Sequence, residues 1–386
     1  MTWNKIDPMI ERMKFIVAAS QDYPDSFAHL CRSFGVSRKT GYKWLVRYET
    51  FGPAGLLDQP PLPKAMPNQL PPETVALLVA SRKEHPTWGS KKLRAFLQTQ
   101  NPQLVLPAPS TISDWLKRYG LIRPRKRRLR VPISTNPLAP CDFPNEVWCL
   151  DFKGHFAMQD LLRCYPLTIM DGCSRYLFKC EGLLEPREEP VKHHFELAFK
   201  EFGLPRRLRS DNGAPFASTA IGGLSSLSIW WIKLGIVPER IEPGHPEQNG
   251  RHERMHRTLK EETAFPPKEN LLLQQRAFDL FRREYNEVRP HEALNQEVPA
   301  KHYIVSPRAY PAVLPEVEYP RGFEIRRVYP NGSVSFQGAS FTIAQFLKRE
   351  LVGFSEVGDQ EWDAYFGPVK LGRVTKRGNS VNFKKA

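Results

Sequence analysis

The sequence predicts a multidomain fold with an all-α N-terminal part, a central α/β part and a small C-terminal β-barrel. Three observations lead to this prediction. The chain has 386 residues, which is more than the roughly 100–200 residues of one ordinary domain. Its 36 prolines gather between segments of regular pattern, where they prevent helices and strands. The apolar periodicity also changes along the chain, from helical spacing to mixed strands and helices and then to short alternating strands.

Positive charge is the first indication of a partner. The formal net charge is +15, and residues 1–135 alone carry 22 Lys and Arg against 9 Asp and Glu. This excess predicts a polyanionic partner for the N-terminal part, whereas the remainder is nearly neutral. No apolar run approaches the roughly 18 residues of a membrane span. The six cysteines form no CxxC pair and are typical of reduced thiols. We therefore expect a soluble cytoplasmic protein without a membrane segment.

Residues 1–58 are predicted to form a helix-turn-helix DNA-binding domain. Gly35 fits the turn between two helices, and Tyr42, Leu45 and Val46 form the expected apolar face of the second helix. In this layout the second helix enters the major groove. The alternative is a helical hairpin with a solvated cationic face. The expected DNA contacts are Arg38, Lys39, Lys43 and Arg47.

Two linkers flank a second helical unit. Residues 59–72 are rich in proline and are expected to form a stiff spacer. Residues 73–122 form a second helix-turn-helix-like domain, with Lys91 and Lys92 displayed for DNA. Residues 123–139 form a basic linker, in which six of the eight residues of RPRKRRLR are positive. A solvated linker is the alternative, but a linker that follows DNA phosphates is favoured beside two such units. Its expected DNA contacts are Arg125, Lys126, Arg127 and Arg128.

Residues 140–305 show strands and helices in alternation, which predicts an α/β layout. NEVWCLDFKGHF is a strand with apolar residues on both faces up to Asp151, so we expect it to be central in a sheet. Two β-rich runs around the Asp171-Gly172 turn predict a hairpin. Residues 315–386 contain short alternating strands with glycine turns, which predict the small β-barrel.

Three acidic residues stand out by their positions. Asp151 ends an apolar strand, where a carboxylate is costly unless it has a partner or a metal. Asp211 ends another short strand, and Glu253 lies on a helix that begins near Asn249-Gly250. Such carboxylates can converge as the hard oxygen ligands that Mg²⁺ or Mn²⁺ prefers. Most isolated carboxylates are caps or ion-pair partners, and we assign that ordinary role to Asp160, Asp171, Glu247, Glu261 and Glu262.

The helix of Glu253 carries two further signals. Arg257 and Lys260 share its face, and we predict that both contact DNA phosphates beside the metal site. Ordinary charge pairing along a solvated helix is the alternative. The segment HERMH, with His252 and His256 four residues apart, also matches the H-E-x-x-H motif of zinc proteases. Neighbouring arginines would repel zinc, and no third ligand follows at a suitable spacing, so the protease is the least favoured alternative.

Three segments together resemble the retroviral-integrase-like DDE catalytic core, most closely that of bacterial insertion-sequence transposases. They are NEVWCLDFKGHF, RSDNGAPFAS and GHPEQNGRHERMHRTLKEE. The resemblance implies an RNase H-like fold for residues 140–305. It also implies that Asp151, Asp211 and Glu253 are the catalytic residues and bind two Mg²⁺ or Mn²⁺ ions. Forty-one residues separate Asp211 from Glu253, somewhat more than the family usually shows, and ASTAIGGLSSLSIWWIKLG is expected to hold the excess.

The resemblance further implies what the protein does. It implies a transposase whose helix-turn-helix units bind terminal inverted repeats of an insertion sequence. The core would cleave the transposon 3′ end and transfer it to target DNA. Synapsis of two ends implies at least a dimer, in a bacterial cytoplasm and associated with the nucleoid when bound to DNA. A DNA-binding regulator with an inactive core is the alternative, and the intact carboxylates argue against it.

Overall fold

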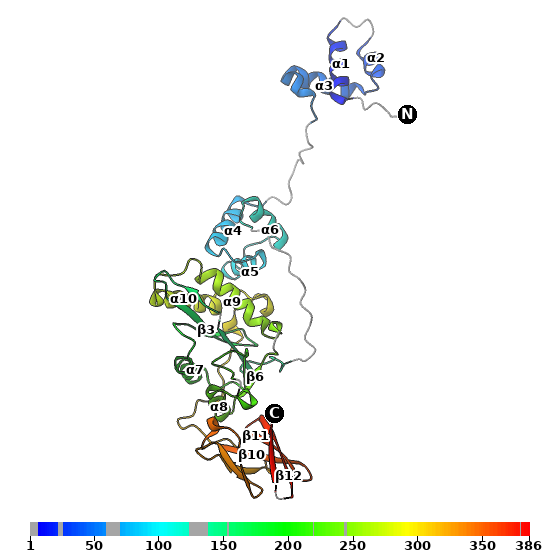
Figure 1. The fold of residues 1–386 in the computed structure, drawn as a ribbon. Helices are drawn as coiled ribbons and strands as arrows, with labels where there is room; N and C mark the ends of the chain where they lie inside the picture. Colours follow the sequence, from blue (N-terminus) through cyan, green and yellow to red (C-terminus); the bar gives the residue numbers. More distant parts are fainter. Residues whose placement is uncertain are drawn as a thin grey trace. The chain divides into compact units, whose positions relative to one another are not determined.

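The chain divides into two compact units, Met1–Leu70 and Pro71–Ala386, which are described separately (Figure 1). The computed structural model describes residues 7–21, 26–58, 70–122, 138–152, 154–218, 220–242, 245–378 and 380–386. Most of the predicted proline-rich spacer, residues 59–72, and of the predicted basic linker, residues 123–139, lies outside these ranges. Within them, no helix is both long and apolar enough to cross a membrane.

The first unit is a small helical domain with its own core. It consists of α1 (Pro8–Ser20), α2 (Phe27–Ser33), α3 (Arg38–Phe51) and the 3-10 helix η1 (Gly52–Leu56). Ser37 starts α3 as its N-cap, because its hydroxyl accepts the Thr40 amide at 3.2 Å. The turn before it uses Gly35 at a φ of +66°, a left-handed conformation that glycine adopts without steric cost. The two helices around Gly35 are therefore as the sequence predicts.

The buried face of α3 differs from the predicted one. Tyr42 and Val46 are 50% and 57% exposed, whereas Gly41 and Trp44 are buried. A Cβ on Gly41 would lie 2.7 Å from Cys31 Sγ, so glycine permits α3 to approach α2 closely. The apolar pattern misses this face because glycine contributes no apolar side chain to it. The buried face of α3 is therefore displaced by about one residue from the predicted apolar face.

The second helical group belongs to the larger unit. It consists of α4 (Pro72–Glu84), α5 (Ser90–Gln100) and α6 (Pro109–Arg118). Each helix buries residues three or four positions apart, which is the helical period. The buried apolar side chains are Val75, Leu78, Leu93, Leu97, Ile112 and Leu116.

The central part is a six-stranded sheet. Its strands are β1 (Val147–Phe152), β2 (Phe156–Ala157), β3 (Arg163–Asp171), β4 (Leu177–Leu183), β5 (Arg207–Ser210) and β6 (Val237–Arg240). The strand β3 pairs antiparallel with β1, β2 and β4, whereas β5 is parallel to both β1 and β6. The predicted central strand is thus confirmed as β1, between β3 and β5. The predicted hairpin is β3–β4.

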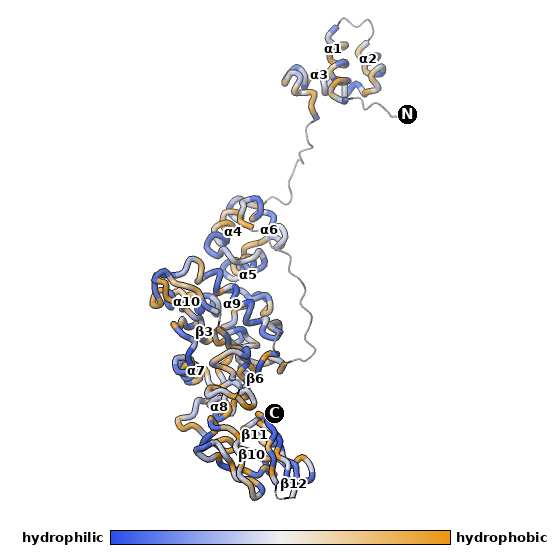
Figure 2. The backbone as a smooth tube through the Cα atoms, viewed as in Figure 1, coloured by the Kyte–Doolittle hydropathy of each residue, from blue (hydrophilic) through white to orange (hydrophobic). Residues whose placement is uncertain are grey.

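Helices cover this sheet with two separate apolar cores. They are α7 (Glu188–Phe202), α8 (Ser226–Lys233), α9 (Gly250–Thr263) and α10 (Leu271–Glu287). One core joins α7 and α8 to β1, with Phe195, Trp231 and Trp148 among its buried residues. The other joins α9 and α10 to β3 and β4 through Met255 and Phe278. Although α9 is mostly hydrophilic (Figure 2), it is held by its few buried side chains.

The C-terminal part is an open β structure. The strands β7 (Glu324–Arg327), β10 (Leu351–Gly358), β11 (Glu361–Phe366), β12 (Val369–Arg377) and β13 (Ser380–Lys385) form one sheet in the order β13-β12-β11-β10-β7. The strands β8 (Ser333–Phe336) and β9 (Ala339–Thr342) form a separate hairpin. Phe336 of the hairpin stacks on Phe354 of the sheet at 4.0 Å between ring centroids. The predicted small barrel is not confirmed, because no ladder between the described strands closes this sheet.

Candidate active site

Two of the predicted acidic residues lie at the carboxyl ends of neighbouring parallel strands. Asp151 lies in β1, and Asp211 directly follows β5. The β1–β5 register pairs Cys149 with Arg209, and each aspartate comes two residues after its member of this pair. Carboxyl ends of parallel strands meet at one edge of a sheet. The fold therefore brings Asp151 and Asp211 to the same edge.

The backbone around Asp211 turns immediately after the strand. The Gly213 amide donates to Asp211 Oδ1 at 3.1 Å, which forms the Asx turn that aspartate favours after a strand. Asn212 Nδ2 donates to the Ile241 carbonyl at 2.7 Å and ties the turn to the chain beyond β6. These hydrogen bonds fix the position of Asp211 at the end of β5.

Glu253 lies in the first turn of α9 and is exposed. The helix buries His252, Met255 and His256 instead. Throughout the part of the chain that the structure describes, no three His, Cys, Asp or Glu side chains are grouped closely enough to hold one metal ion. The structure thus brings the two aspartates to one sheet edge and does not gather Glu253 with them into a three-ligand group.

The predicted cations of α9 share the exposed side of Glu253. Arg257 and Lys260 are both exposed, four and seven residues after Glu253, as the helical period requires. Lys260 Nζ lies 5.2 Å from the centre of the Phe265 ring, which is within cation–π range. Both positions remain compatible with phosphate contact.

The two histidines of the H-E-x-x-H segment point into the protein. His252 is 0% and His256 is 4% exposed, and the Nε2 atom of each lies 2.6 Å from Thr168 Oγ1. Burial lowers the pKa of His252 to about 3, so this ring is neutral. Because both rings contact a buried hydroxyl, and no three-ligand group exists within the described residues, the zinc-protease alternative is not favoured.

Thr168 also connects these histidines to Asp151. It pairs with Asp151 across the β1–β3 ladder, and its Oγ1 lies 3.1 Å from the Asp151 carbonyl oxygen. His256 Nδ1 in turn lies 3.6 Å from Asp151 Oδ2. Sequence reasoning missed this cluster, although two histidines four residues apart on a polar helix were a signal for a shared buried face.

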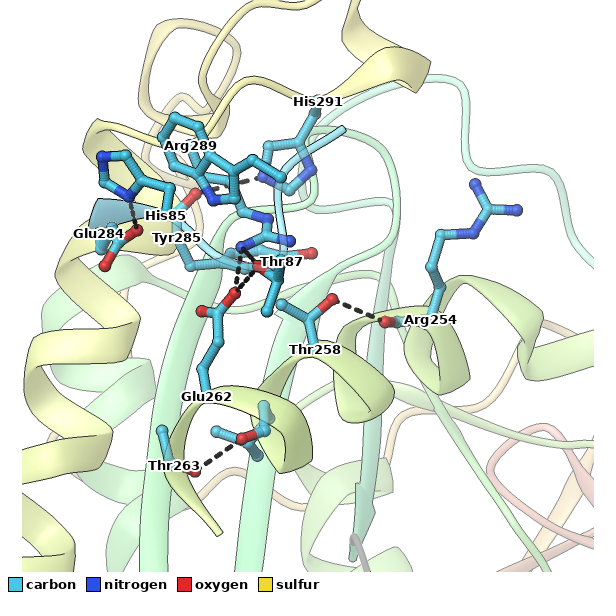
Figure 3. A network of polar contacts seen from close by, with 12 residues as sticks. His85, Thr87, Arg254, Thr258, Glu262, Thr263, Glu284, Tyr285, Arg289 and His291 are labelled. Atoms are coloured by element: carbon cyan, nitrogen blue, oxygen red, sulfur yellow. Dashed lines mark hydrogen bonds and ion pairs between the residues drawn. The ribbon is translucent and has the colours of Figure 1, made fainter. Parts of the chain in front are cut away.

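The second helical group packs on α9 and α10 through charged residues (Figure 3). Glu262 at the end of α9 accepts hydrogen bonds from Thr87 at 2.5 Å and from Arg289 at 2.6 Å. The Arg289 and Glu262 side chains are only 6% and 19% exposed, so this is a largely buried ion pair. His85 contacts Glu284 of α10 at 3.2 Å. Glu262 therefore has the ordinary ion-pair role that the sequence assigns to it.

This packing uses the two lysines that were predicted to contact DNA. Lys91 Nζ lies 2.5 Å from Glu292 Oε1. Burial, together with the nearby Arg289 cation, lowers the pKa of Lys92 to about 7. Lys92 therefore belongs to the junction between the second helical group and the core, whereas Lys91 is 61% exposed and forms a surface ion pair.

The predicted contacts of the first unit are placed differently. Arg38, Lys39 and Lys43 are exposed, whereas Arg47 donates to the Leu57 carbonyl at 2.8 Å and so helps to hold η1 against α3. The four predicted contacts of the basic linker, Arg125, Lys126, Arg127 and Arg128, lie outside the described residues. Only three of the predicted α3 cations thus remain on an open face.

Family models match the central and the N-terminal parts separately. Two models described as Integrase core domain match residues 142–246 and 234–299. A Helix-turn-helix domain model matches residues 11–64, and a Homeodomain-like domain model matches residues 40–116. The fold and these matches define a protein with helix-turn-helix domains followed by an integrase core.

Individual relatives show which particular proteins the chain is similar to. An uncharacterized 31.7 kDa protein of insertion element IS407 from Burkholderia multivorans is 28% identical over 234 residues, which cover 58% of this chain and 79% of that protein. An uncharacterized 39.2 kDa protein of insertion element IS476 from Xanthomonas euvesicatoria is 27% identical over 250 residues, 60% of this chain and 65% of that protein. This chain is therefore similar to proteins of bacterial insertion elements and carries an integrase core, as the sequence motifs predict.

Solved structures with a similar chain include the integrase catalytic core domain of HTLV-2 in complex with magnesium. It is 15% identical, and the alignment covers 42% of this chain and 98% of that chain with a TM-score of 0.34. The integrase intasome of simian T-cell lymphotropic virus is also 15% identical. There the alignment covers 79% of this chain and 95% of that chain, with a TM-score of 0.37.

Proposed function

We propose that this chain is a transposase that cleaves the 3′ ends of its insertion sequence and joins them to target DNA. Asp151, Asp211 and Glu253 are the proposed catalytic residues. The observation that carries the proposal is the placement of Asp151 and Asp211 at the same edge of the sheet, after the adjacent parallel strands β1 and β5.

The donor chemistry of the proposed residues fits a divalent metal. Carboxylate oxygens are the ligands that Mg²⁺ and Mn²⁺ prefer. Two such ions, when bound, would supply an activated water and stabilise the leaving oxygen at phosphorus. Asp151 and Asp211 would hold them from the sheet edge, and Glu253 from the first turn of α9. In the described conformation Glu253 is not gathered with the aspartates, so complete binding requires Glu253 to approach the sheet edge.

The chain's other residues have proposed roles in DNA binding. The exposed cations Arg38, Lys39 and Lys43 of α3 would contact the terminal inverted repeats, as the second helix of a helix-turn-helix does. Arg257 and Lys260 would contact the phosphates of the DNA end beside Glu253. Because two ends must be brought together, the active complex is proposed to contain at least two copies of the chain.

The test is to separate cleavage from end binding. Asp151→Asn and Asp211→Asn remove one proposed ligand each while keeping side-chain size. Both are expected to abolish Mg²⁺-dependent cleavage of a DNA fragment that carries the element's end, with end binding unchanged in a gel-shift assay. Asp160→Asn is the matched control, because Asp160 is exposed and its side chain accepts the Leu162 amide.

Two results would contradict the proposal. Cleavage that survives in Asp151→Asn or Asp211→Asn would mean that the active site is elsewhere. An unsubstituted chain that binds the ends but cleaves under no divalent-metal condition would instead be the inactive DNA-binding regulator.

A further inference from the structure

The buried histidines of α9 form a cluster directly behind Asp151. His252 and His256 are four residues apart, so they share a helix face, and both Nε2 atoms lie 2.6 Å from Thr168 Oγ1. Thr168 is 0% exposed, so no bulk water competes for its hydroxyl. The catalytic assignment of Asp151 does not by itself explain why two imidazoles meet at this hydroxyl.

The hydrogen-bonding capacity of Thr168 restricts the cluster. A threonine hydroxyl has one proton to donate and two lone pairs that accept. Its Oγ1 has three neighbours, namely the two Nε2 atoms and the Asp151 carbonyl oxygen at 3.1 Å. If the hydroxyl donates to that carbonyl, both histidines must donate from Nε2. If it donates to one histidine, only the other donates from Nε2.

The contact with the Asp151 side chain involves the other nitrogen of His256. His256 Nδ1 lies 3.6 Å from Asp151 Oδ2, which is a close electrostatic contact rather than a formed hydrogen bond. A bare Nδ1 at this place would repel the carboxylate, whereas an Nδ1–H group attracts it. The Thr168 contact at Nε2 thus orients a ring whose Nδ1 side faces the carboxylate.

The other end of the cluster shows which His252 nitrogen carries the proton. His252 Nδ1 is buried without a hydrogen-bond partner among the described residues. With the His252 proton on Nε2, the unpaired atom is a bare acceptor rather than a buried donor. His252 thus donates from Nε2 to Thr168.

We propose that His252, Thr168 and His256 form a hydrogen-bond relay that orients the Asp151 carboxylate for metal binding. His252 and Thr168 hold the His256 ring from its Nε2 side, and His256 faces Asp151 with Nδ1. His256 is thus a positioning residue, because it acts on the metal through Asp151. The inference rests on the proposed function of Asp151. It assigns the H-E-x-x-H histidines to the support of a carboxylate rather than to zinc.

The relay would hold the Asp151 carboxylate in one orientation. The Asp151 side chain is only 21% exposed and lies at the edge of the sheet. Partners that orient a ligand in this way typically change metal affinity by about 10- to 100-fold when they are removed. Since α9 carries both Glu253 and the histidines, the relay also links the helix of one proposed ligand to the strand of another.

Two matched pairs of substitutions in the full chain test the relay. His256→Gln keeps an amide near the Nε2 position and removes the donor that faces Asp151, whereas His256→Asn keeps an amide donor near the Nδ1 position. Thr168→Val removes the hydroxyl, and Thr168→Ser restores it. The measurement is Mn²⁺ affinity of the DNA-free protein, from the free-ion electron paramagnetic resonance signal, with the melting temperature recorded for each variant.

Within each pair, one variant is expected to bind Mn²⁺ more weakly than the other. His256→Gln and Thr168→Val are expected to bind Mn²⁺ about 10-fold more weakly, and His256→Asn and Thr168→Ser to stay within about 3-fold of the unsubstituted chain. Equal affinities within both pairs would overturn the relay, whether the affinities are unchanged or equally reduced. Stoichiometric zinc bound through the histidines would overturn it as well.

Asp151→Asn separates failure of the relay from failure of the proposed function. If Asp151→Asn loses Mn²⁺ affinity while all four relay variants bind like the unsubstituted chain, the proposed ligand stands and the relay is wrong. If Asp151→Asn binds Mn²⁺ unchanged, Asp151 is not a ligand, and the proposed function and the relay both fail.

Discussion

The two N-terminal helical groups, residues 7–58 and 71–122, both place cationic side chains on a helix that follows a turn, but these cations meet different surroundings. In the first group, Arg38 and Lys39 are exposed and have no carboxylate partner among the residues that the structure describes. In the second, Lys91 is paired with Glu292. A cationic helix can therefore present an open surface for a polyanion or complete a junction within the protein.

The difference comes from residues far away in the sequence. The core offers Glu262, Glu284 and Glu292 to the second group, and Arg289 lies 5.9 Å from the centre of the Trp88 ring. The first group forms a compact unit of its own. Nothing in the local pattern of either helix reveals which surroundings it will meet.

The largest expected effect is on the junction of the second group. Arg289→Met leaves Glu262 without its charged partner in a largely buried place, which typically costs about 3–5 kcal/mol. We expect faster hydrogen exchange in residues 71–122 and a lower melting temperature of the larger unit. Exchange in residues 7–58 should be unchanged.

A surface ion pair provides the control for this substitution. Arg283 and Glu287 are 76% and 56% exposed, so Arg283→Met should change stability by less than about 1 kcal/mol. Equal effects of Arg283→Met and Arg289→Met would show that the buried junction does not hold the second group to the core.

The next effect concerns the first group alone. Gly41→Val places a branched side chain where a Cβ already lies 2.7 Å from Cys31 Sγ, and overpacking of this kind costs about 1–3 kcal/mol. Hydrogen exchange should increase in residues 7–58 and stay unchanged in the larger unit. Glu49→Val is the control at an exposed position of α3, and destabilisation by both variants alike would contradict the close approach at Gly41.

Measuring the affinity for DNA tests the difference between the two cationic helices directly. Replacing Arg38, Lys39 and Lys43 together by Gln should weaken binding to an end fragment by about 10- to 100-fold and reduce its salt dependence, because lost phosphate contacts release fewer counterions. Lys91→Gln should change the affinity by less than about 3-fold, since this lysine is already paired within the protein. A larger loss for Lys91→Gln than for the triple variant would reverse the assignment of the two helices.

A further expected effect is a pH dependence of the junction. Burial, and next the cation of Arg289, lowers the pKa of Lys92 to about 7, whereas an unfolded lysine has a pKa of about 10.4. Between these values the unfolded chain binds more protons, so stability should rise with pH above 7 and level off near 10. Below pH 7 the lysine is charged in both states and contributes no slope.

The measurement is unfolding free energy against pH for the unsubstituted chain minus that for Lys92→Met. This difference should increase from pH 7 to pH 9. The corresponding difference for Lys83→Met should stay flat, because Lys83 is exposed. A flat difference for Lys92 would mean that this lysine is not desolvated by the junction.

Much of the fold could be predicted from local patterns. The apolar run before Asp151 predicted a central strand, and the Asp171-Gly172 turn predicted the hairpin β3–β4. The open C-terminal sheet was not predictable in the same way. Alternation shows that strands exist and which face each buries, but closure into a barrel depends on whether the edge strands β7 and β13 pair.

Three carboxylates could be selected as candidates from the sequence, because nearby residues already place them at strand ends or on a helix. The segments that contain them also carry the family resemblance. The sequence thus determined the classes of its domains, the candidates Asp151, Asp211 and Glu253, and the excess of positive charge near the N-terminus. Only the tertiary structure decided that Thr168 lies between two histidines and Asp151, and that the exposed Lys91 pairs with Glu292. Local backbone preferences act over a few residues, whereas the contacts of Thr168 with the histidines and of Lys91 with Glu292 join segments more than 80 residues apart, so only packing can specify them.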